Sequence, residues 1–461
     1  MPHQTHLKPS HRTLFYLAIS LATLNACAEV RCPSTKQKQD GQCIDPQAQD
    51  QSDPSTLHVE WAQVVPDETQ HLAVGSSDQF FLITHTADTE TLSSYDGNGS
   101  SLWDVDFEAD SERLEMGGDR LFLGMLSPSA KAPSYNASPV FEDITDGATH
   151  MSILAIDPSD GSMLSAKDFV FAGNQIEGPL FDIASDSVFV AGTMNDNINV
   201  VVGESLVQPP NNMFITKLDT QNMDVQWITG LSFSMPNTLI PGMPPLGTLE
   251  AKADHVILCG NFGGTDNATD NFGDGVTRET IGGTDIFIMA FNASNGALRW
   301  VQTFGGPGND GCNTLSIGEQ TVWVGGHEAQ RPMIASLSLE DGSLNSHKTW
   351  DVIAGEIASI EIDAFGDLYI GGSSEGSWKP YTLPGNSQNR DIFILRYRPS
   401  AKQITWSKLW SAQDNEMLFD MILTEAGALY SLVEFNGPFD FGTGSLGSGN
   451  AAQKAFVKVA P

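Results

Sequence analysis

Short apolar runs separated by polar turns fill the chain from residue 58 to its end. Within these runs apolar and polar positions alternate with a period of two, which is the pattern of a half-buried β-strand. One kind of run ends in glycine or another small residue. Seven runs of this kind occur, at 81–84, 121–124, 188–192, 256–260, 322–326, 368–372 and, in a degenerate form, 429–432. Their recurrence predicts a fold built from repeated sheets.

Three further strands complete each repeat. After an insertion of variable length, a second apolar strand follows and ends near Asp or Asn, as at 285–292. A polar turn then leads to a third strand, which often contains a tryptophan. Four of these tryptophans are Trp103, Trp227, Trp300 and Trp406. The fourth strand precedes the glycine-ended run, as at 357–362. Four antiparallel strands joined by Asp-Gly, Asn-Gly or Gly-Gly turns predict the blades of a β-propeller.

The two ends of this region complement each other. Residues 58–64 form a tryptophan strand with nothing before it, and 455–459 form the strand type that precedes one. We therefore expect the first strand to be the outermost strand of the last blade, which would remove an exposed sheet edge. The sequence predicts an all-β fold over 58–461: a seven-bladed β-propeller of four-stranded antiparallel blades, closed by pairing of the N- and C-terminal strands.

Residues 1–26 have the features of an export signal. Lys8 and Arg12 precede an apolar run at 14–24, which is too short for a membrane span of ~20 residues but suits a signal peptide. The sequence Leu-Asn-Ala-Cys at 24–27 resembles the lipobox of bacterial lipoproteins, although asparagine replaces the usual small residue. The resemblance implies lipid attachment at Cys27; ordinary cleavage after Ala28 is the alternative.

Residues 27–57 are predicted to form a polar, flexible linker, because they contain almost no large apolar side chains. The chain has five cysteines, so four remain if Cys27 is lipidated. Cys32 and Cys43 are candidates for a small disulfide loop in an oxidising compartment. Cys259 and Cys312 either pair or remain buried thiols. No Cys-x-x-Cys motif occurs, so neither a zinc ribbon nor a redox motif is indicated.

The net charge of the chain limits the classes of partner that it is expected to bind. With 57 acidic and 23 basic residues, the formal net charge is −34 at pH 7. Such a surface repels nucleic-acid phosphates and anionic lipid headgroups. We therefore expect no nucleic-acid partner, and membrane attachment through the lipid anchor. A protein or a glycan partner remains open.

Several segments resemble known propeller repeats. Residues 282–288, 295–300, 304–310 and 436–442 are similar to the bacterial SBBP repeat of exported surface proteins, which implies no defined catalytic residues. Residues 157–161 and 292–300 resemble, more weakly, the repeat of quinoprotein-like propellers. A lipoprotein of that second kind serves as an outer-membrane assembly scaffold in other bacteria, although a shared fold does not transfer function.

Few residues suggest specific chemistry. Asp266, Asp270 and Asp274 recur every four residues in a glycine- and asparagine-rich insertion, where carboxylates could bind Ca²⁺. The spacing is not that of an EF-hand, and a solvated loop is the alternative. No other cofactor is expected. The glycine-rich segments 306–311, 372–376 and 442–447 are predicted turns or strand ends, because no helix is predicted after them.

Three residues are candidates for a binding surface. His327 follows a blade strand, where it could face the mouth of the ring, and Trp378 and Tyr381 lie in a polar insertion. Exposed aromatic side chains often mark contact surfaces.

These observations favour a non-catalytic, exported lipoprotein that acts as a binding or scaffold propeller. We expect it at the outer membrane or cell surface, or otherwise in the periplasm or secreted. Two alternatives stay open: a quinone-dependent dehydrogenase, for which no catalytic residues can be assigned, and a carbohydrate-binding propeller that uses Trp378 and Tyr381.

Overall fold

The computed structural model divides the chain into two units, 1–57 with Pro461, and 58–460. It describes residues 37–39, 42–44, 58–66, 69–75, 78–85, 89–127, 134–141, 149–171, 176–194, 200–202, 205–207, 213–231, 246–264, 269–273, 275–376, 389–411, 414–447 and 451–460. In the first unit, β1 (Gln37–Gln39) pairs antiparallel with β2 (Gln42–Ile44). No helix in the described residues has the length and apolarity needed to cross a membrane.

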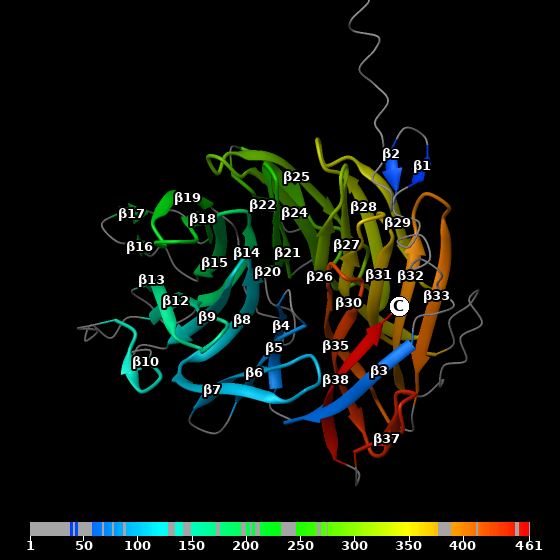
Figure 1. The fold of residues 1–461 in the computed structure, drawn as a ribbon. Helices are drawn as coiled ribbons and strands as arrows, with labels where there is room; N and C mark the ends of the chain where they lie inside the picture. The colour runs from blue at the N-terminus through cyan, green and yellow to red at the C-terminus, as the bar shows by residue number, and fades with distance from the viewer. Residues whose placement is uncertain are drawn as a thin grey trace, which may run out of the picture. The chain divides into compact units, whose positions relative to one another are not determined.

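The second unit is a seven-bladed β-propeller, which confirms the predicted fold (Figure 1). Each blade is an antiparallel sheet, and its strands are named in order from the innermost to the outermost. Blade 1 contains β4 (Thr69–Val74), β5 (Phe80–His85), β6 (Glu90–Tyr95) and β7 (Ser101–Glu108); blade 2 contains β8 (Asp110–Gly117), β9 (Arg120–Ser127), β12 (Thr149–Ile156) and β13 (Met163–Phe171); blade 3 contains β14 (Ile176–Ala184), β15 (Ser187–Met194), β18 (Met213–Asp219) and β19 (Val225–Leu231); blade 4 contains β20 (Leu246–Lys252), β21 (His255–Gly263), β24 (Thr284–Asn292) and β25 (Leu298–Phe304).

The remaining blades follow the same order. Blade 5 contains β26 (Asp310–Ile317), β27 (Thr321–Glu328), β28 (Arg331–Ser338) and β29 (Leu344–Thr349); blade 6 contains β30 (Ala354–Ile362), β31 (Leu368–Glu375), β32 (Arg390–Arg398) and β33 (Gln403–Trp410); blade 7 contains β34 (Met417–Leu423), β35 (Leu429–Asn436), β38 (Ala452–Ala460) and β3 (His58–Val65). The seven glycine-ended runs of the sequence are the second strands of the blades.

The ring closes through its two ends, as predicted. Strand β3 pairs antiparallel with β38, and the two lie side by side in Figure 1. The rings of Trp61 and Phe456 lie 5.4 Å apart. Lys458 Nζ lies 3.0 Å from Glu60 Oε2 on β3 and 3.1 Å from Asp78 Oδ2 in blade 1. The first and last described strands of the ring therefore share one sheet.

The prediction of four strands per blade is incomplete, because four insertions form hairpins of their own within the described residues. Two of these hairpins extend the preceding blade to six strands, since β10 pairs with β7 and β16 pairs with β13. The hairpins are β10 (Ser134–Tyr135) with β11 (Ser138–Pro139), β16 (Val200–Val202) with β17 (Ser205–Val207), β22 (Thr269–Asn271) with β23 (Thr277–Glu279), and β36 (Phe439–Asp440) with β37 (Ser445–Leu446). Strands this short show no period in the sequence.

Apolar side chains of the second and third strands form the core between neighbouring blades. Val256 and Leu258 on β21 and Phe287 and Met289 on β24 are fully buried, for example, together with residues of blade 3. Burial of this kind contributes ~25 cal/mol per Å² of apolar surface and supplies most of the stability of the ring.

The antiparallel order gives the ring two different faces. We call "turn face" the one that carries the connections from first to second strands and from third to fourth strands. Those connections are short, as at 118–119, 253–254 and 339–343. We call "insertion face" the opposite one, where the connections are often long, as at 128–148, 195–212, 232–245, 264–283 and 437–451. The ring therefore presents compact turns on one side and long connections on the other.

Candidate functional site

The first strands of the seven blades surround a central cavity of about 670 Å³. Every residue that lines it belongs to β4, β8, β14, β20, β26, β30 or β34. Its volume lies within the range of small-ligand sites, ~300–1,000 Å³. We call this cavity the channel and take it as the first candidate functional site.

Each innermost strand contains a β-bulge or register irregularity against its neighbour. The shifts fall between Thr69 and His71, Ser111 and Arg113, Glu177 and Leu180, Leu246 and Thr248, Cys312 and Thr314, Ile357 and Ser359, and Leu418 and Asp420. A bulge leaves a residue unpaired and re-aims the side chains around it. Skipped residues such as Glu112, Asn313 and Phe419 line the channel for this reason.

Carboxylates dominate the charged lining of the channel. Four of them occupy the same position of their strands, four residues after the start of the bulge or, in blade 3, five: Glu115, Asp182, Glu250 and Glu361. Glu112 and Asp420 add two more, whereas Arg113 is the one guanidinium among the lining residues. The lining is therefore rich in acids, and its charge depends on which of them are protonated.

These carboxylates also join neighbouring blades. Asp182 Oδ2 in blade 3 accepts the backbone N–H of Ala251 in blade 4 at 2.5 Å. Glu250 in blade 4 accepts the backbone N–H of Ile317 in blade 5 at 3.0 and 3.1 Å. A side chain on one innermost strand thus binds the backbone of the next, so the acidic ring has a structural role as well as a possible role in binding.

Burial shifts the protonation of this lining. It raises the pKa of Glu250 to about 8, and the neighbouring Asp182 carboxylate adds to the rise. It also raises the pKa of Asp420 to about 6 and that of Glu361 well above its usual range. Burial lowers the pKa of His71 to about 4. At pH 7, therefore, His71 is neutral and Glu250 is largely protonated.

The sequence analysis missed the channel residues. In the sequence, the four aligned acids do not stand out, because their strands contain other charged residues, such as Glu112 and Arg113 in β8 and Glu356 in β30. The order of residues also does not reveal where a bulge lies. Aligning the repeats on the starts of their glycine-ended runs would have placed Glu115, Asp182 and Glu250 in one column, because each precedes its run by six residues; Glu361 precedes its run by seven.

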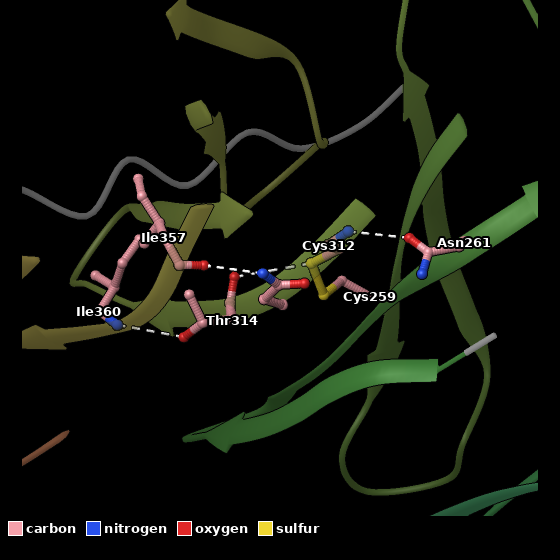
Figure 2. Close-up of a disulfide and its surroundings, with 7 residues drawn as sticks. Cys259, Asn261, Cys312, Thr314, Ile357 and Ile360 are labelled. Atoms are coloured by element: carbon pink, nitrogen blue, oxygen red, sulfur yellow. Dashed lines mark hydrogen bonds between the residues drawn. A yellow bond between two sulfur atoms is a disulfide. The ribbon is translucent and has the colours of Figure 1, made fainter. Parts of the chain in front are cut away.

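Two of the predicted cysteines are joined. Cys259 on β21 and Cys312 on β26 form a disulfide between blades 4 and 5, and both side chains are buried. Figure 2 shows this disulfide beside a chain of hydrogen bonds: the Cys312 N–H donates to Asn261 Oδ1 at 2.9 Å, and the Ile360 N–H donates to Thr314 Oγ1 at 3.3 Å. The bridge and these bonds link blades 4, 5 and 6.

His327 lies at the end of β27 on the insertion face, half-buried, and does not line the channel. Burial lowers its pKa, opposed by the charges of Glu356 and Asp310. Arg390 Nη1 donates to Glu356 Oε1 at 3.4 Å nearby. A binding role for His327 stays a prediction.

The other predicted site residues are mostly outside the described part of the chain: Cys27, Cys32, Asp266, Asp274, Trp378 and Tyr381. Cys43 lies on β2, and Asp270 is buried on β22. Among the described residues, no three His, Cys, Asp or Glu side chains are grouped so that they could hold a metal. Calcium binding in this insertion, the Cys32–Cys43 bridge and the aromatic contact surface stay predictions.

No protein-family model matches the sequence, and no curated protein matches it. Solved structures of similar fold include BamB from Moraxella catarrhalis, with 10% identity, a TM-score of 0.44, and coverage of 88% of this chain and 100% of that one. Quinohemoprotein alcohol dehydrogenase from Comamonas testosteroni has 10% identity, a TM-score of 0.43, and coverage of 88% and 77%. The Dos1 propeller has 10% identity, a TM-score of 0.43, and coverage of 89% and 96%. Membership of the SBBP family is not shown.

Proposed function

We propose that this protein is a non-catalytic, exported lipoprotein that acts as a binding or scaffold propeller at the outer membrane or cell surface, and that it recognises its partner with the insertion face. The unequal distribution of connections between the two faces is the observation that supports this proposal. Loops on a rigid scaffold vary without disturbing the core, and binding residues are concentrated on such loops.

Two exposed apolar side chains on the insertion face provide positions at which this proposal can be tested. Ile281, in the connection before β24, is 63% exposed, and Ile353, in the connection before β30, is 60% exposed. Phe365, 64% exposed in the turn between β30 and β31, provides a comparable side chain on the turn face.

The location rests on the N-terminal region and on the disulfide. The predicted lipobox implies a lipid on Cys27, and residues 28–57 would tether the ring to the membrane. The buried Cys259–Cys312 bridge supports an oxidising compartment, because such bridges rarely persist in the cytosol.

The proposal is tested by capture of partners from native membranes with tagged, full-length protein. Ile281→Asp and Ile353→Asp should reduce capture of a reproducible partner, since a buried charge is costly at an interface. Phe365→Asp, the matched control, should leave capture unchanged. Equal loss in all three variants, or no loss in any, would contradict recognition by the insertion face.

A further inference from the structure

The predicted tether joins the ring at the turn face. Strand β3 begins at His58, which pairs with Ala460, the last residue of β38 (Figure 1). Because β38 is the third strand of blade 7, it ends at the turn face. Strand β3 runs antiparallel to it and therefore begins at that face. The chain that would connect the ring to a lipid on Cys27 thus leaves from the turn face.

The length of the tether favours one orientation of the ring on a membrane. A flexible chain of about 30 residues, the length of the predicted linker 28–57, has a root-mean-square end-to-end distance of ~30 Å. Strand β8 has 8 residues, which at ~3.3 Å per residue separate the two faces by ~26 Å. With the insertion face on the membrane, His58 would stand at that height, and the linker would have to pass along the side of the ring. With the turn face on the membrane, the linker needs no extension.

A group of exposed apolar side chains lies at the turn face in the two blades that follow blade 7. Leu102, the second residue of β7, is 54% exposed, and Met163 and Leu164, the first two residues of β13, are 40% and 47% exposed. Fourth strands begin at the turn face, so all three residues lie there. We call these three residues the apolar rim.

Contacts between blades 1 and 2 bring the two parts of the apolar rim into one region. The indole Nε1–H of Trp103 donates a hydrogen bond to Pro158 O at 3.0 Å, and a Cβ atom on Gly161 would lie 2.8 Å from the same ring. Leu102 directly precedes this tryptophan, and Met163 follows Gly161 by two residues. The start of β7 therefore lies beside the turn that leads into β13.

The acids around the apolar rim determine which lipid surface it fits. Asp96, in the turn before β7, accepts the N–H groups of Ser100 and Asn98 at 2.8 and 2.9 Å. Asp157, in the turn before β13, accepts the hydroxyl and the N–H of Ser159 at 2.6 and 2.8 Å. These hydrogen bonds lower the pKa of both carboxyl groups, so both are charged at neutral pH. Anionic headgroups would be repelled, whereas a zwitterionic surface would admit the apolar side chains.

We propose that the ring rests on a zwitterionic lipid surface through the apolar rim, so that the turn face lies toward the membrane and the insertion face is directed away from it. This inference deepens the proposed function and rests on it, because it assumes the lipid on Cys27. The tether keeps the apolar rim at a high local concentration beside the bilayer, so a weak contact is sufficient. The orientation leaves the insertion face free to meet a partner.

Resonance energy transfer tests the orientation with the full-length lipoprotein in phosphatidylcholine vesicles that contain a headgroup-labelled acceptor lipid. The donor dye is attached through a clickable amino acid at Asp119, in the turn after β8, or at Asp110, the first residue of β8. Both side chains are exposed. Transfer should be stronger from position 119, corresponding to a difference in height of up to ~26 Å. Equal transfer from the two positions, or stronger transfer from position 110, would overturn the proposal.

The contribution of the apolar rim is tested by the triple variant Leu102→Ser/Met163→Ser/Leu164→Ser. It should lower transfer from position 119 by about half, because the rim no longer binds lipid while the anchor remains. Leu344→Ser is the matched control: Leu344 is 43% exposed at the start of β29 in blade 5, away from the apolar rim, and its loss should change nothing. Unchanged transfer in the triple variant would contradict contact through the rim. Leu102→Ser alone replaces the triple variant if circular dichroism shows that the latter is not folded.

Vesicle flotation separates failure of this inference from failure of the proposed function. If the wild-type protein does not float with the vesicles, the lipid anchor is absent, and both proposals are wrong. If the protein floats but transfer does not differ between positions 119 and 110, the lipoprotein proposal stands and only the orientation is wrong.

Discussion

The indole Nε1–H of Trp300 in blade 4 donates a hydrogen bond to the carbonyl oxygen of Leu339 in blade 5, 3.1 Å away. Trp103 and Trp227 make the same bond to the next blade, to Pro158 O and Ala293 O, both at 3.0 Å. Gly342 completes the contact, because its φ is +70° and a Cβ there would lie 2.5 Å from the Trp300 ring. The tryptophans of these strands therefore connect blades 1, 3 and 4 to the next blade by hydrogen bonds.

Trp300→Phe should lower the free energy of unfolding by about 1 kcal/mol, because it removes the hydrogen bond but keeps most of the packing. Trp300→Ala should cost about 3–5 kcal/mol, because it also opens a cavity. Urea unfolding followed by circular dichroism measures both. Leu102→Ala, at a side chain that is 54% exposed, is the control. A negligible effect of Trp300→Ala would show that the indole contact does not stabilise the ring.

The raised pKa of Glu250 predicts a pH dependence of stability. An acid whose pKa is about 8 in the folded protein binds its proton more tightly there than when unfolded. Its stabilising contribution is therefore complete below the unfolded value of ~4.3 and is lost as the pH rises toward 8. The urea midpoint should be higher near pH 5.5 than near pH 8.5.

Glu250→Gln should reduce the difference in the free energy of unfolding between pH 5.5 and pH 8.5 by about 1 kcal/mol or more, because it removes the titrating group. The amide oxygen of the variant can still accept the Ile317 N–H. Glu319→Gln, at an exposed position, should not alter this difference. A stability that rises from pH 5.5 to 8.5 by the same amount in wild type and Glu250→Gln would contradict the prediction.

The inter-blade disulfide should stabilise the ring mainly by restricting the unfolded chain. Its cysteines are 53 residues apart in sequence, so removal in the double variant Cys259→Ala/Cys312→Ala should cost about 2–4 kcal/mol. Urea unfolding with and without reductant tests this. Reductant should lower the urea midpoint of the wild type more than that of the double variant. If it lowers both midpoints equally, the loss of stability on reduction comes from other cysteines.

Lipid attachment predicts a change of location. Cys27→Ser should move the protein from the membrane pellet to the soluble envelope fraction and abolish labelling by a radioactive fatty acid. Cys43→Ser is a matched cysteine control and should keep both properties. Retention of the label in Cys27→Ser would exclude the predicted anchor.

Much of the fold was predictable because its signals are local. Period-two alternation and recurring glycine-ended runs indicate strands without knowledge of distant contacts, and the unmatched strands 58–64 and 455–459 indicated closure. The β10 hairpin was not predictable in this way, since Ser134 and Tyr135 become a strand only by pairing with Glu108 and Phe107.

The sites depend on contacts that residue order does not show. Glu115 and Glu250 reach one channel because bulges re-aim them on separate strands. Cysteine pairing was likewise left open by the sequence, because parity alone does not select partners.

Recognition by the insertion face is tested most directly by placing a photo-crosslinking amino acid at Ile353 or at Phe365 of the full-length protein in native membranes. The proposal predicts a discrete, reproducible adduct from position 353, identified by mass spectrometry, and none from position 365. Adducts from position 365 alone, or the same adducts from both positions, would contradict it.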